Sequence, residues 1–115
     1  IPSELSTLTN LNVLLLGYNE LSGNIPKELG MLTNLEFLSL EANNFYGNIP
    51  EELSNLTNLE ELNLASNKLT GDIPNLCGSY SIDLSENYLN ERPLDGRYVT
   101  YEAFQKIFSG KSARN

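Results

Sequence analysis

The sequence contains no histidine and a single cysteine, Cys77, among its 115 residues. A lone cysteine excludes an intramolecular disulfide, and a Cys/His zinc site would need more ligands than are present. The common catalytic arrangements, in which histidine acts as a base or activates a nucleophile, are excluded as well. We therefore predict a protein that is not an enzyme and holds no metal or other cofactor. Cys77 is interpreted as a small buried hydrophobic residue, with a reactive thiol as the alternative.

Basic residues and long apolar runs are also scarce. Seven Lys and Arg residues stand against 15 Asp and Glu, giving a formal net charge of −8. This charge repels nucleic-acid phosphates and anionic lipid headgroups. No apolar run approaches the roughly 20 residues that a membrane-spanning helix requires, and the first residues do not resemble a signal peptide. We expect a protein or peptide partner, basic or neutral, with no nucleic acid and no direct membrane insertion.

What the chain does have is a strict internal repeat. Asn19, Asn43 and Asn67 recur with a 24-residue period and carry the same surrounding pattern of leucines, one glycine and an Ile-Pro pair. Leucines that alternate with variable positions, such as Leu14 and Leu16, predict one short strand in each repeat. One such coil buries too little apolar surface to offset its lost conformational entropy, so the coils must stack on one another.

Each asparagine of the repeat follows a predicted strand, where the chain turns away. Its side-chain amide can pair with inward-facing backbone groups of its own coil and of its neighbour. The glycine and the Ile-Pro pair then return the chain along the convex side of the coil. We predict a structural ladder of asparagines, formed by Asn19, Asn43, Asn67 and Asn87.

These motifs cover residues 1–90 and resemble the plant-type leucine-rich repeats of receptor-like kinase ectodomains and polygalacturonase-inhibitor-like proteins. The resemblance implies an α/β fold. This would be a right-handed solenoid with a parallel concave sheet, a short second strand near each Leu-x-Gly, and 3₁₀ segments on the convex side. It also implies a receptor-like or inhibitor-like recognition module at an extracellular or cell-surface location. The paired-cysteine caps common in that family are missing, so an intracellular or organellar location within a complex is the alternative.

The repeat weakens toward the C-terminus. Ile82, Leu84 and Asn87 repeat the earlier pattern at a shorter spacing than that of the regular coils. We assign residues 1–93 to the solenoid, as a partial first coil, three regular coils and one shortened coil. The first coil begins without a segment that covers its core and leaves a strand edge open. We therefore expect the chain to be part of a longer protein, or to associate through its N-terminal edge as a structural or scaffold subunit.

Beyond the solenoid, aromatic residues recur at helical spacing. Tyr101, Phe104 and Phe108 would share one face of a short helix,. We predict a C-terminal cap over residues 94–110 that contains this helix and covers the leucine core, with a partner-binding helix as the alternative. Residues 111–115 are predicted to be a flexible tail.

The side chains that point out of the predicted concave strands form the candidate binding face. Equivalent positions of neighbouring coils lie about 4.8 Å apart, so these side chains align in columns. The columns change from apolar and aromatic to acidic, which predicts anchoring of a partner by the first kind and selection of a basic one by the second. Alternatively, the acidic residues only maintain solubility, and preceding sequence covers the apolar ones. The predicted partner-binding residues are Val13, Leu15, Tyr18, Phe37, Glu41, Glu61, Asn63, Asp83 and Glu86.

One short motif lies outside this face. Asn55-Leu56-Thr57 fits the acceptor sequence for N-linked glycosylation,. It falls on the predicted convex side and would be used only in a secreted protein. The alternative is a chance match, since the repeat is rich in asparagine and threonine.

Overall fold

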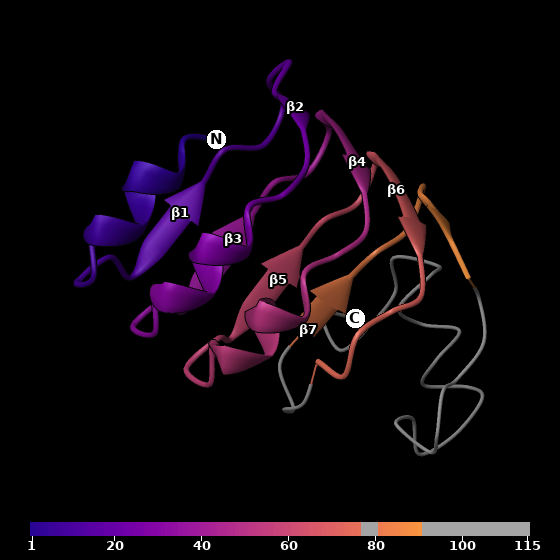
Figure 1. Cartoon of the computed structure of the whole chain (residues 1–115). Coiled ribbons are helices and arrows are strands. Elements are labelled where there is room, and N and C mark those ends of the chain that lie inside the picture. The colour runs from indigo at the N-terminus through magenta and orange to yellow at the C-terminus, as the bar shows by residue number, and fades with distance from the viewer. Residues whose placement is uncertain (77–80, 91–115) are drawn as a thin grey trace.

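The computed structural model describes residues 1–76 and 81–90, which form stacked coils with one concave sheet. The strands of this sheet lie side by side in one row (Figure 1). Leu14 pairs with Leu38 and Leu38 with Leu62, in line with the 24-residue period, whereas Leu62 pairs with Ile82 because the last coil is shorter. All pairs are parallel, and the order is β1 (Val13–Leu15), β3 (Phe37–Ser39), β5 (Glu61–Asn63) and β7 (Ser81–Asp83).

A second parallel sheet runs along another side of the coils. Ser22 pairs with Asn44 and Tyr46 with Lys68, so each pairing spans slightly less than one full repeat. Equivalent residues of this sheet therefore lie diagonally to one another. Its strands, in order, are β2 (Ser22–Gly23), β4 (Asn44–Gly47), β6 (Lys68–Gly71) and β8 (Tyr88–Leu89).

Short 3₁₀ helices form a third row along the coils (Figure 1). Each follows a proline in an extended conformation, whose fixed φ and missing N–H suit a residue just outside a helix. At Gly30 two of these helices approach so closely that an added Cβ would overlap the backbone carbonyl of Glu52. No helix in the described part of the chain is long and apolar enough to cross a membrane. The three helices are η1 (Ser3–Thr7), η2 (Lys27–Met31) and η3 (Glu51–Asn55).

The space between these rows is filled by one leucine core. Leu38, Leu62 and Phe45 expose 1% or less of their surface, whereas Leu11 and Leu16 of the first coil are only half-buried. Phe45 occupies the position that leucine takes in the neighbouring coils. Because each coil buries its leucines against the next, the core continues along the whole stack.

The predicted α/β solenoid is confirmed by the two parallel sheets, the 3₁₀ segments and the continuous core. The predicted glycine role also has a visible cause at Gly47, which has a φ of +83° and faces the side-chain amide of Asn24. Cys77, the cap over residues 94–110 and the tail over residues 111–115 lie outside the described residues. The boundary of the solenoid at residue 93 therefore stays a prediction.

Candidate functional site

The register of the concave sheet aligns the outward-facing side chains in two columns. Leu14, Leu38, Leu62 and Ile82 are buried at the middle of their strands, so the flanking residues face away from the core. One column contains Val13, Phe37, Glu61 and Ser81, and the other contains Leu15, Ser39, Asn63 and Asp83.

The N-terminal part of this face is apolar and exposed. Val13 is 46% exposed, Leu15 62% and Tyr18 77%, and Phe37 in the next coil is half-buried. Large apolar side chains that lie together on a surface are typical of binding sites. Of the predicted anchors, the structure therefore places three on the first coil and one beside them on the second.

The remaining part of the face is acidic. Glu41 and Glu61 are half-buried and Glu86 is exposed, while Asn63 and Asp83 are only 5% and 6% exposed. No lysine or arginine occurs in the four concave strands or in the three residues after each of them. The face therefore carries negative charge without a neighbouring basic residue from these segments.

One carboxylate joins the two parts of the face. The Tyr18 hydroxyl donates to Glu41 Oε2 at 3.3 Å, and Asn63 Nδ2 donates to Glu41 Oε1 at 3.0 Å. These bonds come from the coils on either side of Glu41 and hold its carboxylate in one orientation. A group fixed in this way loses less conformational entropy when a partner binds.

Asn63 and Asp83 are buried because they fold back onto their own chain. Each accepts a hydrogen bond from the backbone amide two residues later, as asparagine and aspartate do in Asx-turns. The structure therefore places both in the wall of the concave face and not on its surface. The bonds are Ala65 N to Asn63 Oδ1 at 3.0 Å, Ser85 N to Asp83 Oδ1 at 3.1 Å and Ser85 Oγ to Asp83 Oδ1 at 2.7 Å.

The chain bends sharply after each concave strand. Tyr18, Ala42, Ser66 and Glu86 occupy equivalent positions and have φ values of +57° or +58°. Residues with a Cβ rarely adopt this left-handed conformation, which costs about 1 kcal/mol or more. The bend therefore fixes the direction of Tyr18 and Glu86, which belong to the predicted site.

The asparagine after each bend binds the backbone that the bend exposes. Asn43 Nδ2 donates to the carbonyls of Leu16, Leu40 and Glu41 at 3.0 to 3.2 Å, and its Oδ1 accepts from Leu21 N at 3.0 Å. Asn67 and Asn87 make the corresponding bonds one and two coils later. Asn19 Nδ2 bonds only its own coil, at Leu16 and Gly17. We call Asn19, Asn43, Asn67 and Asn87 the inner asparagine column.

The sequence-based prediction did not include a second column of asparagines, which contains Asn10, Asn34 and Asn58. Asn34 Nδ2 donates to the carbonyl of Thr9 at 2.8 Å, and Asn58 Nδ2 donates to that of Thr33 at 2.9 Å. These asparagines are exposed, and each follows a threonine at the same 24-residue spacing. That spacing could have revealed them. We call them the outer asparagine column.

Neither the concave face nor the asparagine columns form a metal site in the described residues. Residues 1–76 and 81–90 contain no group of three or more His, Cys, Asp or Glu side chains placed to hold a metal ion. Within the same ranges, every buried polar side-chain atom has a hydrogen-bond partner. Asn55, the predicted glycosylation residue, lies away from the concave face, exposed at the end of η3.

Stacked coils with two parallel sheets, an asparagine column and a leucine core define a leucine-rich-repeat solenoid. The Leucine Rich Repeat family matches residues 10–32, 34–56 and 58–80, and the chain belongs to this family. Its solved relatives make it a plant-type member. No curated protein matches the chain.

Three solved structures illustrate the likeness, each covering 77% of this chain. The complex of BIR3 and SERK2 from Arabidopsis thaliana matches at 35% identity with a TM-score of 0.72. The ectodomain of the Arabidopsis receptor kinase HAESA, in complex with the peptide hormone IDA, matches at 42% and 0.72. A plant ice-binding protein matches at 44% and 0.74. This chain spans 50%, 16% and 30% of those chains, respectively.

Proposed function

We propose that this chain is a non-catalytic recognition module that binds a protein or peptide on its concave face. The observation that carries the proposal is the exposed patch of Val13, Leu15 and Tyr18 beside the fixed carboxylate of Glu41. An apolar patch supplies the area that anchors a partner, and an adjacent oriented charge selects among partners.

The predicted residues have different roles in this proposal. Val13, Leu15 and Tyr18 contact the partner directly, and Phe37 extends the patch into the second coil. Glu41, Glu61 and Glu86 favour a basic group, because no lysine or arginine of the concave segments competes for them,. Asn63 and Asp83 have indirect roles. Asn63 orients Glu41, and Asp83 closes the turn at Ser85.

The solved relatives support the class of partner and the location. The HAESA ectodomain is solved with a peptide hormone, and BIR3 is solved in complex with SERK2. Both belong to a set rich in plant receptor ectodomains, so we propose an extracellular or cell-surface location for this chain. The intracellular or organellar alternative predicts that the protein is absent from the fluid of the plant cell wall.

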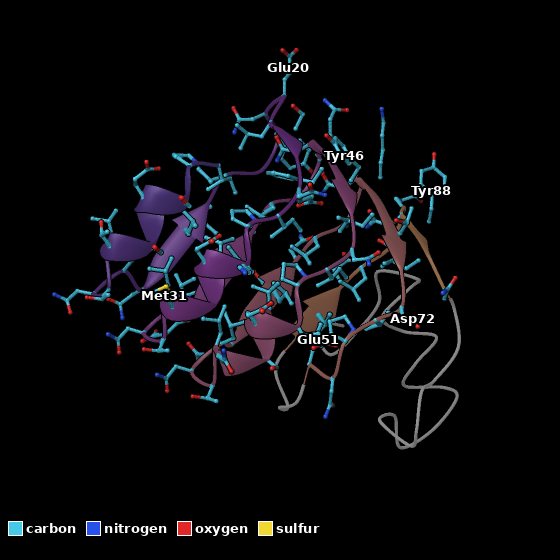
Figure 2. The ribbon with its side chains drawn as sticks, viewed as in Figure 1. Glu20, Met31, Tyr46, Glu51, Asp72 and Tyr88 are labelled. Carbon is cyan, nitrogen blue, oxygen red and sulfur yellow. The ribbon has the colours of Figure 1, made fainter. Side chains whose placement is uncertain are left out.

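Selection from a displayed random-peptide library on the immobilised chain tests the binding face. We expect the retained peptides to be enriched in basic residues and to bind Tyr18→Ala or Phe37→Ala at least about 10-fold more weakly, the loss typical of an interface anchor. Tyr46→Ala is the matched control, because Tyr46 is 52% exposed on β4, in the other sheet (Figure 2). Its binding should equal that of the unchanged chain.

Two outcomes would contradict the proposal. Retained peptides that bind all three variants equally would remove the concave patch as the binding site. A chain that retains no peptide but assembles into a defined oligomer would favour the scaffold alternative. Glu41→Gln removes the charge of the side chain but keeps its shape. It should weaken the binding of basic peptides and reduce the salt dependence of that binding.

A second candidate function is ice binding, which the outer asparagine column favours. Thr9, Thr33 and Thr57 are exposed at equivalent positions, and the amides of Asn34 and Asn58 fix the adjacent backbone. Such a row of hydroxyl groups, repeated once in each coil, can order water at a regular spacing. The solved structure at 44% identity is that of a plant ice-binding protein.

Inhibition of ice recrystallisation separates the two candidates. If the outer row binds ice, Thr33→Lys should abolish the inhibition, because its long charged side chain interrupts the row. Tyr18→Ala should leave the inhibition unchanged. If the wild-type chain does not alter the growth of ice crystals, ice binding is excluded and the proposal of peptide recognition is not affected.

A further inference from the structure

The segment Asn55-Leu56-Thr57 forms a tight turn on the convex side. Asn55 is the last residue of η3, and Thr57 N donates to the carbonyl of Asn55 at 2.9 Å. Leu56 is 1% exposed and is part of the core, whereas Asn55 and Thr57 are both exposed. The buried leucine thus holds the turn in place while the two polar side chains on either side of it stay accessible.

The side-chain amide of Asn55 is available for reaction. Asn43, Asn58 and Asn67 use Nδ2 as a donor to backbone carbonyls, so their nitrogens are part of the fold. Asn55 makes no side-chain hydrogen bond to residues 1–76 or 81–90. Of these asparagines, Asn55 is therefore the one whose amide can be modified without loss of a structural contact.

The position also accepts different side chains. Thr7 and Met31 occupy it in the two preceding coils, and Met31 is 59% exposed at the end of η2 (Figure 2). A threonine, a methionine and an asparagine share no polar contact that the fold requires. An attached group at this position would therefore extend into solvent as Met31 does.

We propose that Asn55 is an acceptor for an N-linked oligosaccharide. In this modification Nδ2 of Asn55 attacks C1 of a sugar carried by a lipid pyrophosphate. The N–C1 bond forms, the C1–O bond to the pyrophosphate breaks, the lipid pyrophosphate leaves, and the amide gives up one proton. The transferase selects the acceptor by the hydroxyl of Thr57. Use of the site in the plant rests on the extracellular or cell-surface location proposed above.

Such a glycan would cover one side of the solenoid and leave the concave side open for binding. It would cover the outer surface of η2 and η3, which form a row that does not contact the concave strands. Tyr18 and Phe37 lie on the concave side and stay uncovered. The glycan therefore prevents association through the convex side and leaves peptide binding on the concave face unchanged.

Translation of the full chain behind a secretory signal, in the presence of microsomes, tests the acceptor. We expect one oligosaccharide, removed by peptide N-glycanase with conversion of Asn55 to aspartate in the mass spectrum. Asn55→Gln and Thr57→Ala should each lose the oligosaccharide. Thr57→Ser should keep it because the hydroxyl is retained, and Asn58→Gln should keep it as the matched neighbouring control.

The result does not depend on the natural location or on the binding face, since the signal is supplied. A wild-type chain without the oligosaccharide would overturn the proposal, as would one whose oligosaccharide persists in Asn55→Gln. Peptides retained by the concave face should bind the glycosylated and the Asn55→Gln chains equally. If only that last comparison fails, the proposed binding face is wrong and the acceptor site stands.

Discussion

From Asn19 to Asn67 the inner asparagine column follows the same 24-residue spacing as the outer column, yet the two columns have different structural roles. Asn43 and Asn67 are each 7% exposed and make three donor bonds and one acceptor bond. Asn34 and Asn58 are exposed and each makes one bond, to a threonine carbonyl of the preceding coil. One residue type thus has a buried role at one end of the strand and a surface role at the other.

The difference arises from the backbone that each column serves. At the inner column the chain leaves its strand through a left-handed residue, such as Ala42, and the carbonyls of Leu16 and Leu40 bond to Asn43. Water does not replace such bonds easily, because Asn43 is buried. At the outer column Asn58 binds a carbonyl in an exposed turn, where water can take its place. The inner column should therefore hold the coils together, while the outer one adds little.

The largest effect is expected for Asn43→Asp, which removes the amide donor and adds a negative charge. The carboxylate would face three carbonyl oxygens in a buried site, and an uncompensated buried charge costs about 3 to 5 kcal/mol of unfolding free energy. Urea unfolding at neutral pH should show this loss. Asn44→Asp is the control, because the neighbouring Asn44 is exposed; equal losses in the two variants would contradict the buried role.

The pH dependence of the same variant has a defined sign. Burial and the nearby carbonyls raise the pKa of the new carboxyl in the folded state above its unfolded value of about 3.9. A raised folded pKa means that the deficit against the wild-type chain is smallest below that value and grows as the pH rises. The difference between variant and wild type should therefore be larger at neutral pH than in mild acid.

A smaller effect is expected for Asn43→Ala, which removes the contacts without adding a charge. Leu21 N and the three carbonyls would lose their partner, and buried polar groups left unpaired cost on the order of 1 to 3 kcal/mol. Asn19→Ala is the matched control in the same column, since Asn19 is exposed and bonds only its own coil. Chemical denaturation should rank Asn43→Ala clearly below Asn19→Ala in stability. Equal stabilities would mean that the bonds between coils do not hold the stack together.

The sequence predicted the stacked coils because their period is strict and each position repeats with the same chemistry. Asn43 stood out because it follows an alternating strand pattern, whereas Asn34 stands in a stretch that reads as an ordinary loop. The burial of Asn63 and Asp83 was not predictable from alternation, which places both on the outward side of a strand. They are buried because each side-chain oxygen accepts a hydrogen bond from the backbone amide two residues later. Strand periodicity carries no information about that hydrogen bond.

For the glycosylation motif and the binding face as well, the sequence predicted positions but not side-chain contacts. Spacing brought Val13 and Phe37 into one column, since register follows from the repeat. The bond between Tyr18 and Glu41 depends instead on the left-handed bend at Tyr18, for which the sequence offers no glycine as a signal. Likewise, the acceptor sequence identified Asn55, but only the contacts of Asn58 and Asn67 distinguish its free amide from bonded ones.

The smallest expected effect belongs to Asn58→Ala, in the outer column. Asn58 Nδ2 makes a single bond, to Thr33 O at 2.9 Å, and the side chain is exposed. Water can pair with the freed carbonyl, so the unfolding free energy should fall by about 0.5 kcal/mol, the low end for one hydrogen bond. Thermal and urea unfolding beside Asn43→Ala provide the measurement. A loss as large as that of Asn43→Ala would mean that the outer turns are as closed to water as the inner ones, and the difference between the columns would disappear.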